Sequence, residues 1–212
     1  MEINKYIDYT NLNNLSTLKD IEKMCNEAIK YKFATVCVYP YYIPLVKKLL
    51  KDTTIEVCTV IGFPHGCNTK ETKVYEAIDA VEKGADEIDM VINISALKNK
   101  NYDYIKEEIE EVRDAIDGKV IKIIIETNLL TKEEIVKMTK ICNETFVNYI
   151  KTSTGGVVKV EDVELINSNK NELLEIKVSG GIKDYDTALK FIKAGATRIG
   201  TSNGVEIMKG GK

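Results

Sequence analysis

Short runs of apolar, mostly β-branched residues alternate with longer amphipathic stretches along the whole chain. Eight runs of the first kind predict strands at Tyr6–Leu12, Ala34–Tyr39, Ile55–Phe63, Glu87–Ile94, Val120–Thr127, Phe146–Ser153, Leu174–Ser179 and Thr197–Thr201. Seven stretches between them predict helices at Thr17–Tyr31, Tyr42–Lys51, Lys70–Lys83, Tyr102–Ile116, Lys132–Cys142, Lys159–Ser168 and Tyr185–Ala194. Strands that alternate with helices are typical of a parallel sheet covered by helices.

Residues at the expected helix ends support this division. Ser16 and Thr131 each precede acidic residues of a first helical turn, which is an N-terminal cap pattern. Gly84 and Gly195 follow turns that carry lysine, where a glycine in the left-handed conformation closes a helix. From Asn203 onward we expect a short C-terminal tail.

The number of units separates two architectures. Eight units favour a (β/α)8 TIM barrel, whereas the doubly wound open sheet usually has about five or six strands. The 212 residues give about 26 for each of eight units, which is compact but sufficient. No linker or low-complexity run divides the chain, so we expect a single TIM-barrel domain over residues 1–212.

Composition excludes several classes of function. His65 is the only histidine, which argues against zinc hydrolases and Ser-His-Asp enzymes, because their sites need one or more histidines. We expect His65 to be a loop residue. The five cysteines form no C-x-x-C pair, which is typical of reduced thiols in a cytoplasmic protein. A net charge of −3 argues against nucleic acid and anionic membranes as partners. No apolar stretch approaches the ~20 residues of a membrane span, and the N-terminal segment has no secretory apolar region.

Several ionisable residues lie inside the predicted strands. In the run from 120 to 127, Ile121, Ile123 and Ile125 share the face expected to pack on helices, so Lys122 faces inward. Lys151, Lys177 and Asp89 lie inside three further strands. Any one of these lysines could instead form a purely structural ion pair. Two lysines together with an aspartate favour a catalytic role, because unpaired buried charge is costly.

Two neighbouring lysines suit Schiff-base catalysis. A lysine amine attacks a carbonyl only when it is neutral, and its ordinary pKa is about 10.4. A second ammonium about 4 Å away costs about 4 kcal/mol at an effective dielectric constant near 20, which corresponds to about three pKa units. Lys151 and Lys177 can therefore supply one nucleophilic amine and one cationic partner, with Asp89 moving protons.

Glycines follow the last two predicted strands, in Ser179-Gly180-Gly181-Ile182 and Gly200-Thr201-Ser202-Asn203-Gly204. Loops at these places in TIM barrels often hold a phosphate through backbone N–H groups. The second segment also matches the G-x-S-x-G pattern of α/β-hydrolases. A hydrolase needs its acid and histidine later in the chain, but only eight residues follow Gly204, so we reject that hypothesis.

Together these segments resemble the deoxyribose-phosphate aldolase family of class I aldolases over nearly the whole chain. The motifs that carry the resemblance are Tyr149–Gly155 (YIKTSTG), Ile7–Thr10 (IDYT), Thr35–Pro40 (TVCVYP), Val60–Pro64 (VIGFP), Asp86–Val91 (DEIDMV), Ile176–Ile182 (IKVSGGI) and Gly200–Ser202 (GTS). The resemblance implies a barrel that reversibly cleaves 2-deoxy-D-ribose 5-phosphate to D-glyceraldehyde 3-phosphate and acetaldehyde, in deoxyribose phosphate catabolism. It also implies no metal or organic cofactor, and a homodimer or homotetramer.

The same resemblance assigns roles to particular residues. Lys151 would form the imine, Lys177 would lower the pKa of the reacting amine, and Asp89 would donate and accept protons. Asp8 and Lys122 would support this network. The substrate and its phosphate would be bound by Cys37, Thr154, Gly180, Gly181, Gly200 and Ser202.

Three positions depart from the family pattern. Tyr9 stands where many members have histidine, which bears on the support of Asp8. The loop after Gly155 is shorter than in many relatives, and no tyrosine follows near the C-terminal Gly210-Gly211-Lys212. Two alternatives stay open: a Schiff-base aldolase or transaldolase-like enzyme for another phosphosugar, and a phosphosugar-binding barrel without catalysis.

Overall fold

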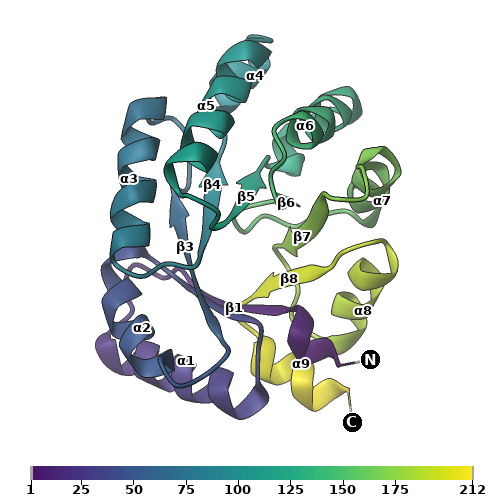
Figure 1. The fold of residues 1–212 in the computed structure, drawn as a ribbon. Helices are drawn as coiled ribbons and strands as arrows, with labels where there is room; N and C mark the ends of the chain where they lie inside the picture. Colours follow the sequence, from purple (N-terminus) through teal and green to yellow (C-terminus); the bar gives the residue numbers. More distant parts are fainter. Residues whose placement is uncertain (1, 212) are drawn as a thin grey trace.

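The computed structural model describes residues 2–211, which form a closed barrel of parallel strands inside a ring of helices (Figure 1). The strands are β1 (Ile7–Asn11), β2 (Thr35–Val38), β3 (Glu56–Ile61), β4 (Glu87–Val91), β5 (Val120–Ile124), β6 (Tyr149–Lys151), β7 (Glu175–Ser179) and β8 (Arg198–Thr201). Each strand pairs with the next in the chain, and β8 pairs with β1. The closed ring confirms the TIM barrel and excludes the open sheet.

Seven helices lie where the sequence predicts them. They are α1 (Leu18–Tyr31), α2 (Ile43–Leu50), α3 (Lys70–Glu82), α5 (Tyr102–Ala115), α6 (Lys132–Glu144), α7 (Val160–Asn169) and α8 (Tyr185–Lys193). The first helix begins one residue later than Ser16 suggested, because Thr17 and Asp20 form the capping box; Thr131 forms another with Glu134. Gly84 and Gly195 adopt positive φ angles of 109° and 117°, as expected for residues that close helices.

Two short helices were not predicted. β4 ends at Val91, and α4 (Ile94–Lys98) begins after Asn93, whose side chain accepts a hydrogen bond from the amide of Ala96 at 3.0 Å. The prediction of a C-terminal tail was wrong, because residues 204–210 form helix α9 (Gly204–Gly210) with Ile207 fully buried. Helices of five and seven residues are too short to show a helical period in the sequence.

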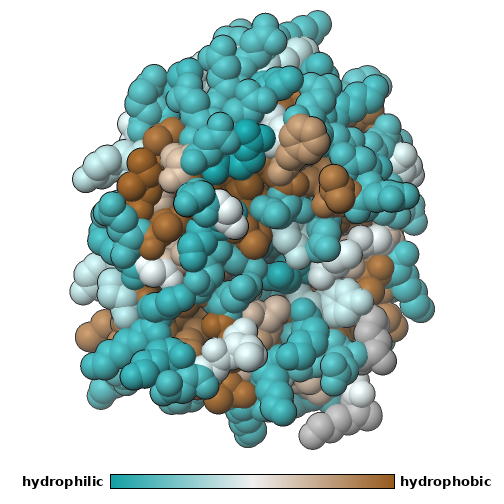
Figure 2. All heavy atoms as spheres, in the orientation of Figure 1, coloured by the Kyte–Doolittle hydropathy of each residue, from teal (hydrophilic) through white to brown (hydrophobic). Residues whose placement is uncertain are grey.

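The main apolar core lies between the outer face of the barrel and the helices. Ile121, Ile123 and Ile125 contribute to it as their alternation predicted. The barrel interior is different: Cys37, Cys58 and Val60 form a small apolar group there, next to buried charged side chains. On the face drawn in Figure 2, hydrophilic residues predominate and apolar ones form small groups. Between residues 2 and 211 no helix has the length and apolar character to cross a membrane.

A buried ion pair outside the barrel was also missed. Lys73 of α3 and Glu108 of α5 are both fully buried, with Nζ and Oε1 2.6 Å apart. Lys73 Nζ also donates to the carbonyl of Val91 at 2.9 Å, and Glu108 Oε2 accepts from the amide of Asn93 at 3.1 Å. Burial lowers the pKa of Lys73 and raises the pKa of Glu108, while each partner opposes the other's shift. The pair ties two helices to the end of β4.

We expect Lys73→Met to lower the free energy of unfolding by about 3–5 kcal/mol, because Glu108 is left buried without its cation. Urea denaturation measures this directly. The double variant Lys73→Met/Glu108→Leu should recover most of the loss, since an apolar pair removes the unpaired charge. A single variant as stable as the parent would contradict the assignment.

Candidate active site

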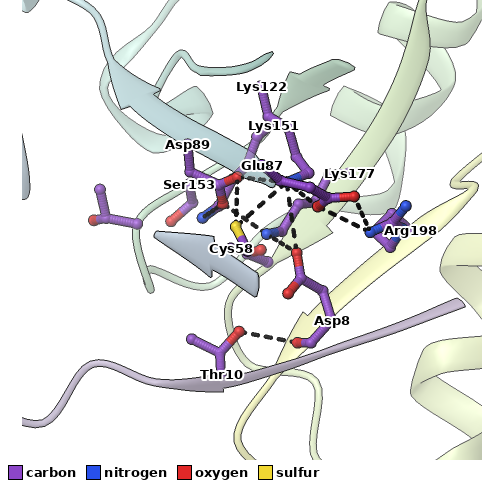
Figure 3. A network of polar contacts seen from close by, with 12 residues as sticks. Asp8, Thr10, Cys58, Glu87, Asp89, Lys122, Lys151, Ser153, Lys177 and Arg198 are labelled. Atoms are coloured by element: carbon purple, nitrogen blue, oxygen red, sulfur yellow. Dashed lines mark hydrogen bonds and ion pairs between the residues drawn. The ribbon is translucent and has the colours of Figure 1, made fainter. Parts of the chain in front are cut away.

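Three lysines and two aspartates from five strands meet inside the barrel. Lys151 on β6 and Lys177 on β7 are register partners, and so are Asp89 on β4 and Lys122 on β5. Register partners on parallel strands present their side chains to the same face of the sheet, so both side chains of each pair point into the barrel. Asp8 on β1 completes the group, as Figure 3 shows. The structure thus brings together all five residues of the predicted catalytic network.

Asp89 lies at the centre of this group. Its Oδ2 accepts hydrogen bonds from Lys151 Nζ at 2.7 Å and Lys177 Nζ at 2.6 Å, and its Oδ1 accepts from Lys122 Nζ at 2.9 Å. The Cys58 thiol also donates to Oδ1, at 3.3 Å. Complete burial acts to raise the pKa of Asp89, but its contacts with Lys122, Lys151 and Lys177 hold it well below its ordinary value. Asp89 is therefore an ionised carboxylate.

Two of the three lysines are held as cations. Burial opposes the charge on Lys177, but Asp8 and Asp89 both contact its Nζ and raise its pKa. Lys122 likewise has a raised pKa, because Asp89 at 2.9 Å and Glu87 at 2.5 Å outweigh its burial. Lys177 can therefore act as the cationic partner expected for Lys151, although the two amines are joined through a shared carboxylate oxygen, which the sequence did not indicate.

An open cleft of about 610 Å³ ends on this group at the carboxyl ends of the strands. Of the three lysines in this group, only Lys151 lines the cleft; Lys177 and Lys122 lie beneath it. The cleft walls include most of the predicted substrate-binding residues, namely Thr154, Gly180, Gly181, Gly200 and Ser202. Cys37 is fully buried beside Cys58 and does not line the cleft. A carbonyl compound in the cleft can therefore reach Lys151.

At two positions a neighbouring segment comes so close to the backbone that only glycine fits. Gly180 has a φ of 113°, and a Cβ there would lie 1.8 Å from the carbonyl oxygen of Gly156, so the two glycine-rich turns touch. At Gly200 a Cβ would lie 2.2 Å from Ser179 Oγ and 3.1 Å from Lys177 Cε. Gly200 thus makes room for the lysine and serine of the neighbouring strand, a packing role that the sequence did not reveal.

The departures from the family pattern have local explanations. The Tyr9 hydroxyl donates to Glu27 on α1 at 2.7 Å and does not contact Asp8, which is supported by the hydroxyl of Thr35 and by Lys177. In the short loop, Ser153 Oγ accepts hydrogen bonds from the amides of residues 155 and 156 at 2.9 and 2.7 Å. His65 is exposed, as expected of a loop residue.

Asp8, Cys37 and Cys58 have donor atoms within 4.8 Å of one another, the spacing of a metal site. The surroundings do not suit a cation. Asp8 is paired with Lys177, and Lys122 Nζ lies 3.4 Å from Cys58 Sγ. Burial also raises the pKa of the Cys58 thiol, whereas a metal ligand must be a thiolate.

Sequence reasoning missed the second layer of this network. Glu87 pairs with Lys122 and also with Arg198, whose Nη1 lies 3.2 Å away. Cys58 is buried and donates a hydrogen bond to Asp89. Glu87 and Asp89 are two residues apart on β4, so the same period-two pattern could have placed Glu87 inside the barrel.

Comparisons with known proteins agree with this geometry. The sequence model of the DeoC/LacD family aldolases matches residues 3–210. A deoxyribose-phosphate aldolase of Clostridium tetani is 51% identical over 216 residues, covering 100% of both chains. One of Finegoldia magna is 51% identical and covers 99% of this chain and 100% of its own. The crystal structure of a putative deoxyribose-phosphate aldolase from Coccidioides immitis superposes with a TM-score of 0.95 at 36% identity, over 98% of this chain and 85% of the other.

Proposed function

This chain belongs to the DeoC/LacD family of aldolases, and on that premise we propose that it is a class I deoxyribose-phosphate aldolase. It cleaves 2-deoxy-D-ribose 5-phosphate reversibly to D-glyceraldehyde 3-phosphate and acetaldehyde, in deoxyribose phosphate catabolism. The observation that carries the catalytic assignment is the position of Lys151, which lines the cleft while its Nζ contacts the carboxylate that also holds Lys177.

The chemistry begins at the Lys151 amine. It attacks the C1 carbonyl of the open-chain sugar, and loss of water gives the imine. The C2–C3 bond then breaks, its electron pair moves into the iminium to form an enamine, and the C3 hydroxyl loses its proton as glyceraldehyde 3-phosphate forms. Protonation of the enamine at C2 and hydrolysis release acetaldehyde and restore Lys151.

Asp89 and Lys177 have different roles. The surrounding lysines hold the pKa of Asp89 well below its usual range, so it is an ionised carboxylate and not a standing carboxylic acid. Its Oδ2 lies 2.7 Å from Lys151 Nζ, where it can relay protons to and from the reacting amine, directly or through water. Lys177, kept cationic by Asp8 and Asp89, is the positive charge beside that amine. Asp8 and Lys122 hold the charges of this group in place.

We assign the phosphate to the far end of the cleft, where Gly180, Gly181 and Ser202 meet. Backbone N–H groups of glycine-rich turns bind phosphate well because no side chain blocks their approach. Thr154 also lines the cleft. Cys37, buried below the cleft, remains a predicted substrate neighbour without a place on the wall.

Borohydride trapping tests the proposal. The protein is incubated with deoxyribose 5-phosphate, or separately with acetaldehyde, then reduced and analysed by peptide mass spectrometry. We expect a reduced adduct on Lys151 that requires the substrate. An adduct on Lys177 would reverse the roles of the two lysines. No adduct on the folded protein would leave a phosphosugar-binding barrel, and trapping by other phosphosugars alone would indicate a different aldolase.

Ser202→Asp tests the place of the phosphate. The exposed Ser202 lies on the cleft wall, so a carboxylate there repels a phosphate. We expect the preference in kcat/KM for deoxyribose 5-phosphate over free deoxyribose to fall by about 10-fold or more, since one like-charge contact costs about 1–4 kcal/mol at this exposure. Ser202→Asn keeps the size without the charge and should fall less. An unchanged preference in the aspartate variant would place the phosphate elsewhere.

Assembly and location form the remaining part of the proposal. We place the protein in the cytoplasm as a homodimer or homotetramer. Tyr41 and Tyr75 are 79% and 73% exposed, and tyrosine is enriched at protein interfaces. A solved deoxyribose phosphate aldolase from Aeropyrum pernix, 28% identical with a TM-score of 0.90 over 98% of this chain and 89% of its own, is described as a tetramer. Light scattering of the purified protein would measure the mass.

A further inference from the structure

One hydroxyl in the cleft has no hydrogen-bond partner. Ser179 is 6% exposed and lines the cleft, yet its Oγ is one of only two buried side-chain polar atoms without a partner among residues 2–211. A buried hydroxyl left without a partner costs about 1–3 kcal/mol, so such groups in native proteins generally have a use. The position of Ser179 on the wall of the cleft indicates that a ligand supplies the partner.

The backbone of Ser179 is fixed by its neighbour on β6. The amide of Ser179 donates to Thr152 Oγ1 at 3.1 Å, and Thr152 Oγ1 donates to the carbonyl of Ser179 at 3.3 Å. Thr152 directly follows Lys151, so this contact also fixes the distance between the reactive amine and Ser179. The serine side chain is therefore presented on a rigid support while its hydroxyl stays unused.

Space for the hydroxyl is provided by Gly200. The point where a Cβ of Gly200 would stand is 2.2 Å from Ser179 Oγ and 3.1 Å from Lys177 Cε. The Ser179 hydroxyl thus lies beside the Lys177 side chain, two residues further along the same face of β7 and directly before Gly180. Its Oγ is itself buried just beneath the cleft wall that Ser179 lines, between Lys177 and the glycine turn, so a rotation about the Cα–Cβ bond turns it toward a ligand.

We propose that Ser179 is a specificity-determining residue that hydrogen-bonds the C4 hydroxyl of the sugar phosphate. This inference rests on the proposed function, in which C1 is bound to Lys151 and the C5 phosphate lies at Gly180 and Gly181. C4 is the carbon next to the one that carries the phosphate, so its hydroxyl faces the residue next to the glycine turn. In the condensation direction, Ser179 recognises the 2-hydroxyl of D-glyceraldehyde 3-phosphate.

The experiment compares two acceptor aldehydes in condensation with acetaldehyde. D-glyceraldehyde 3-phosphate carries the hydroxyl, whereas 3-oxopropyl phosphate has the same aldehyde and phosphate without it. The preference of the parent enzyme, as a ratio of kcat/KM values, should fall about 3- to 10-fold in Ser179→Ala, the size of one neutral hydrogen bond. Ser168→Ala removes an exposed hydroxyl on α7 and should leave the ratio unchanged.

The outcomes separate this inference from the proposed function. Borohydride trapping at Lys151 is measured on the parent and on Ser179→Ala, and both should form the adduct. With trapping intact, an unchanged ratio or an equal fall for the two acceptors would overturn the role of Ser179, because a structural or purely chemical role affects both aldehydes alike. Absence of trapping in the parent would instead overturn the proposed function.

Discussion

Replacing Lys151 with methionine is expected to abolish imine formation and to lower kcat on the order of 10⁴- to 10⁶-fold, the range found when covalent nucleophiles are removed. Methionine matches the length of the lysine stem, and Lys122 and Lys177 still neutralise Asp89. The variant should therefore fold, which separates loss of chemistry from loss of structure. Turnover of deoxyribose 5-phosphate and the thermal midpoint, measured on the same sample, check both parts.

Lys190→Met is the matched control, because it removes an exposed lysine of α8 outside the cleft. It should keep the parent's turnover. Activity of Lys151→Met within about tenfold of the parent would show that another group carries the covalent step.

Lys177→Leu is expected to have the second-largest effect, on the pH at which the enzyme works. Leucine removes one of the positive charges around the Asp89 carboxylate at the reaction centre, so we expect the acidic limb of the pH–rate profile to move to higher pH. A displacement of about two to three pH units lowers turnover at pH 7 by on the order of 10²- to 10³-fold. The measurement is kcat/KM as a function of pH.

Lys73→Met is the control for any loss of stability that Lys177→Leu causes. Both substitutions remove a fully buried lysine from a carboxylate, but Lys73 lies outside the barrel interior. Its pH–rate profile should keep the parent's midpoint even where the folded fraction falls. Parent-like activity of Lys177→Leu at neutral pH would contradict the paired-lysine explanation.

The sequence predicts which side chains face the barrel interior better than it predicts the contacts between them. Period-two alternation places Lys122, Lys151 and Lys177 inside the barrel because a parallel strand covered by helices has one apolar outer face. Alternation cannot show that Asp89 bridges them, because its partners Lys151 and Lys177 lie 62 and 88 residues away. Such contacts depend on the strand register and on the length and conformation of the side chains, and a local sequence pattern shows neither.

Helix α9 and the Ser179 hydroxyl show the same limit. The burial of Ile207 depends on the closed barrel beneath it, and the missing partner of Ser179 is recognised only when every neighbouring donor and acceptor has been placed. The sequence shows Gly200 as a glycine of a predicted phosphate loop. That it leaves space for the Lys177 side chain can be seen only once the neighbouring strand has been placed.

The ion pair between Asp8 and Lys177 joins residues 169 positions apart, across the seam where β8 meets β1. During synthesis on the ribosome, Asp8 therefore emerges long before its partner exists. Lys122 is made earlier but lies 4.0 Å from Asp8, whereas Lys177 contacts it directly, so full burial of the first strand waits until β7 has been made. The active site is then completed in the same late event that closes the ring.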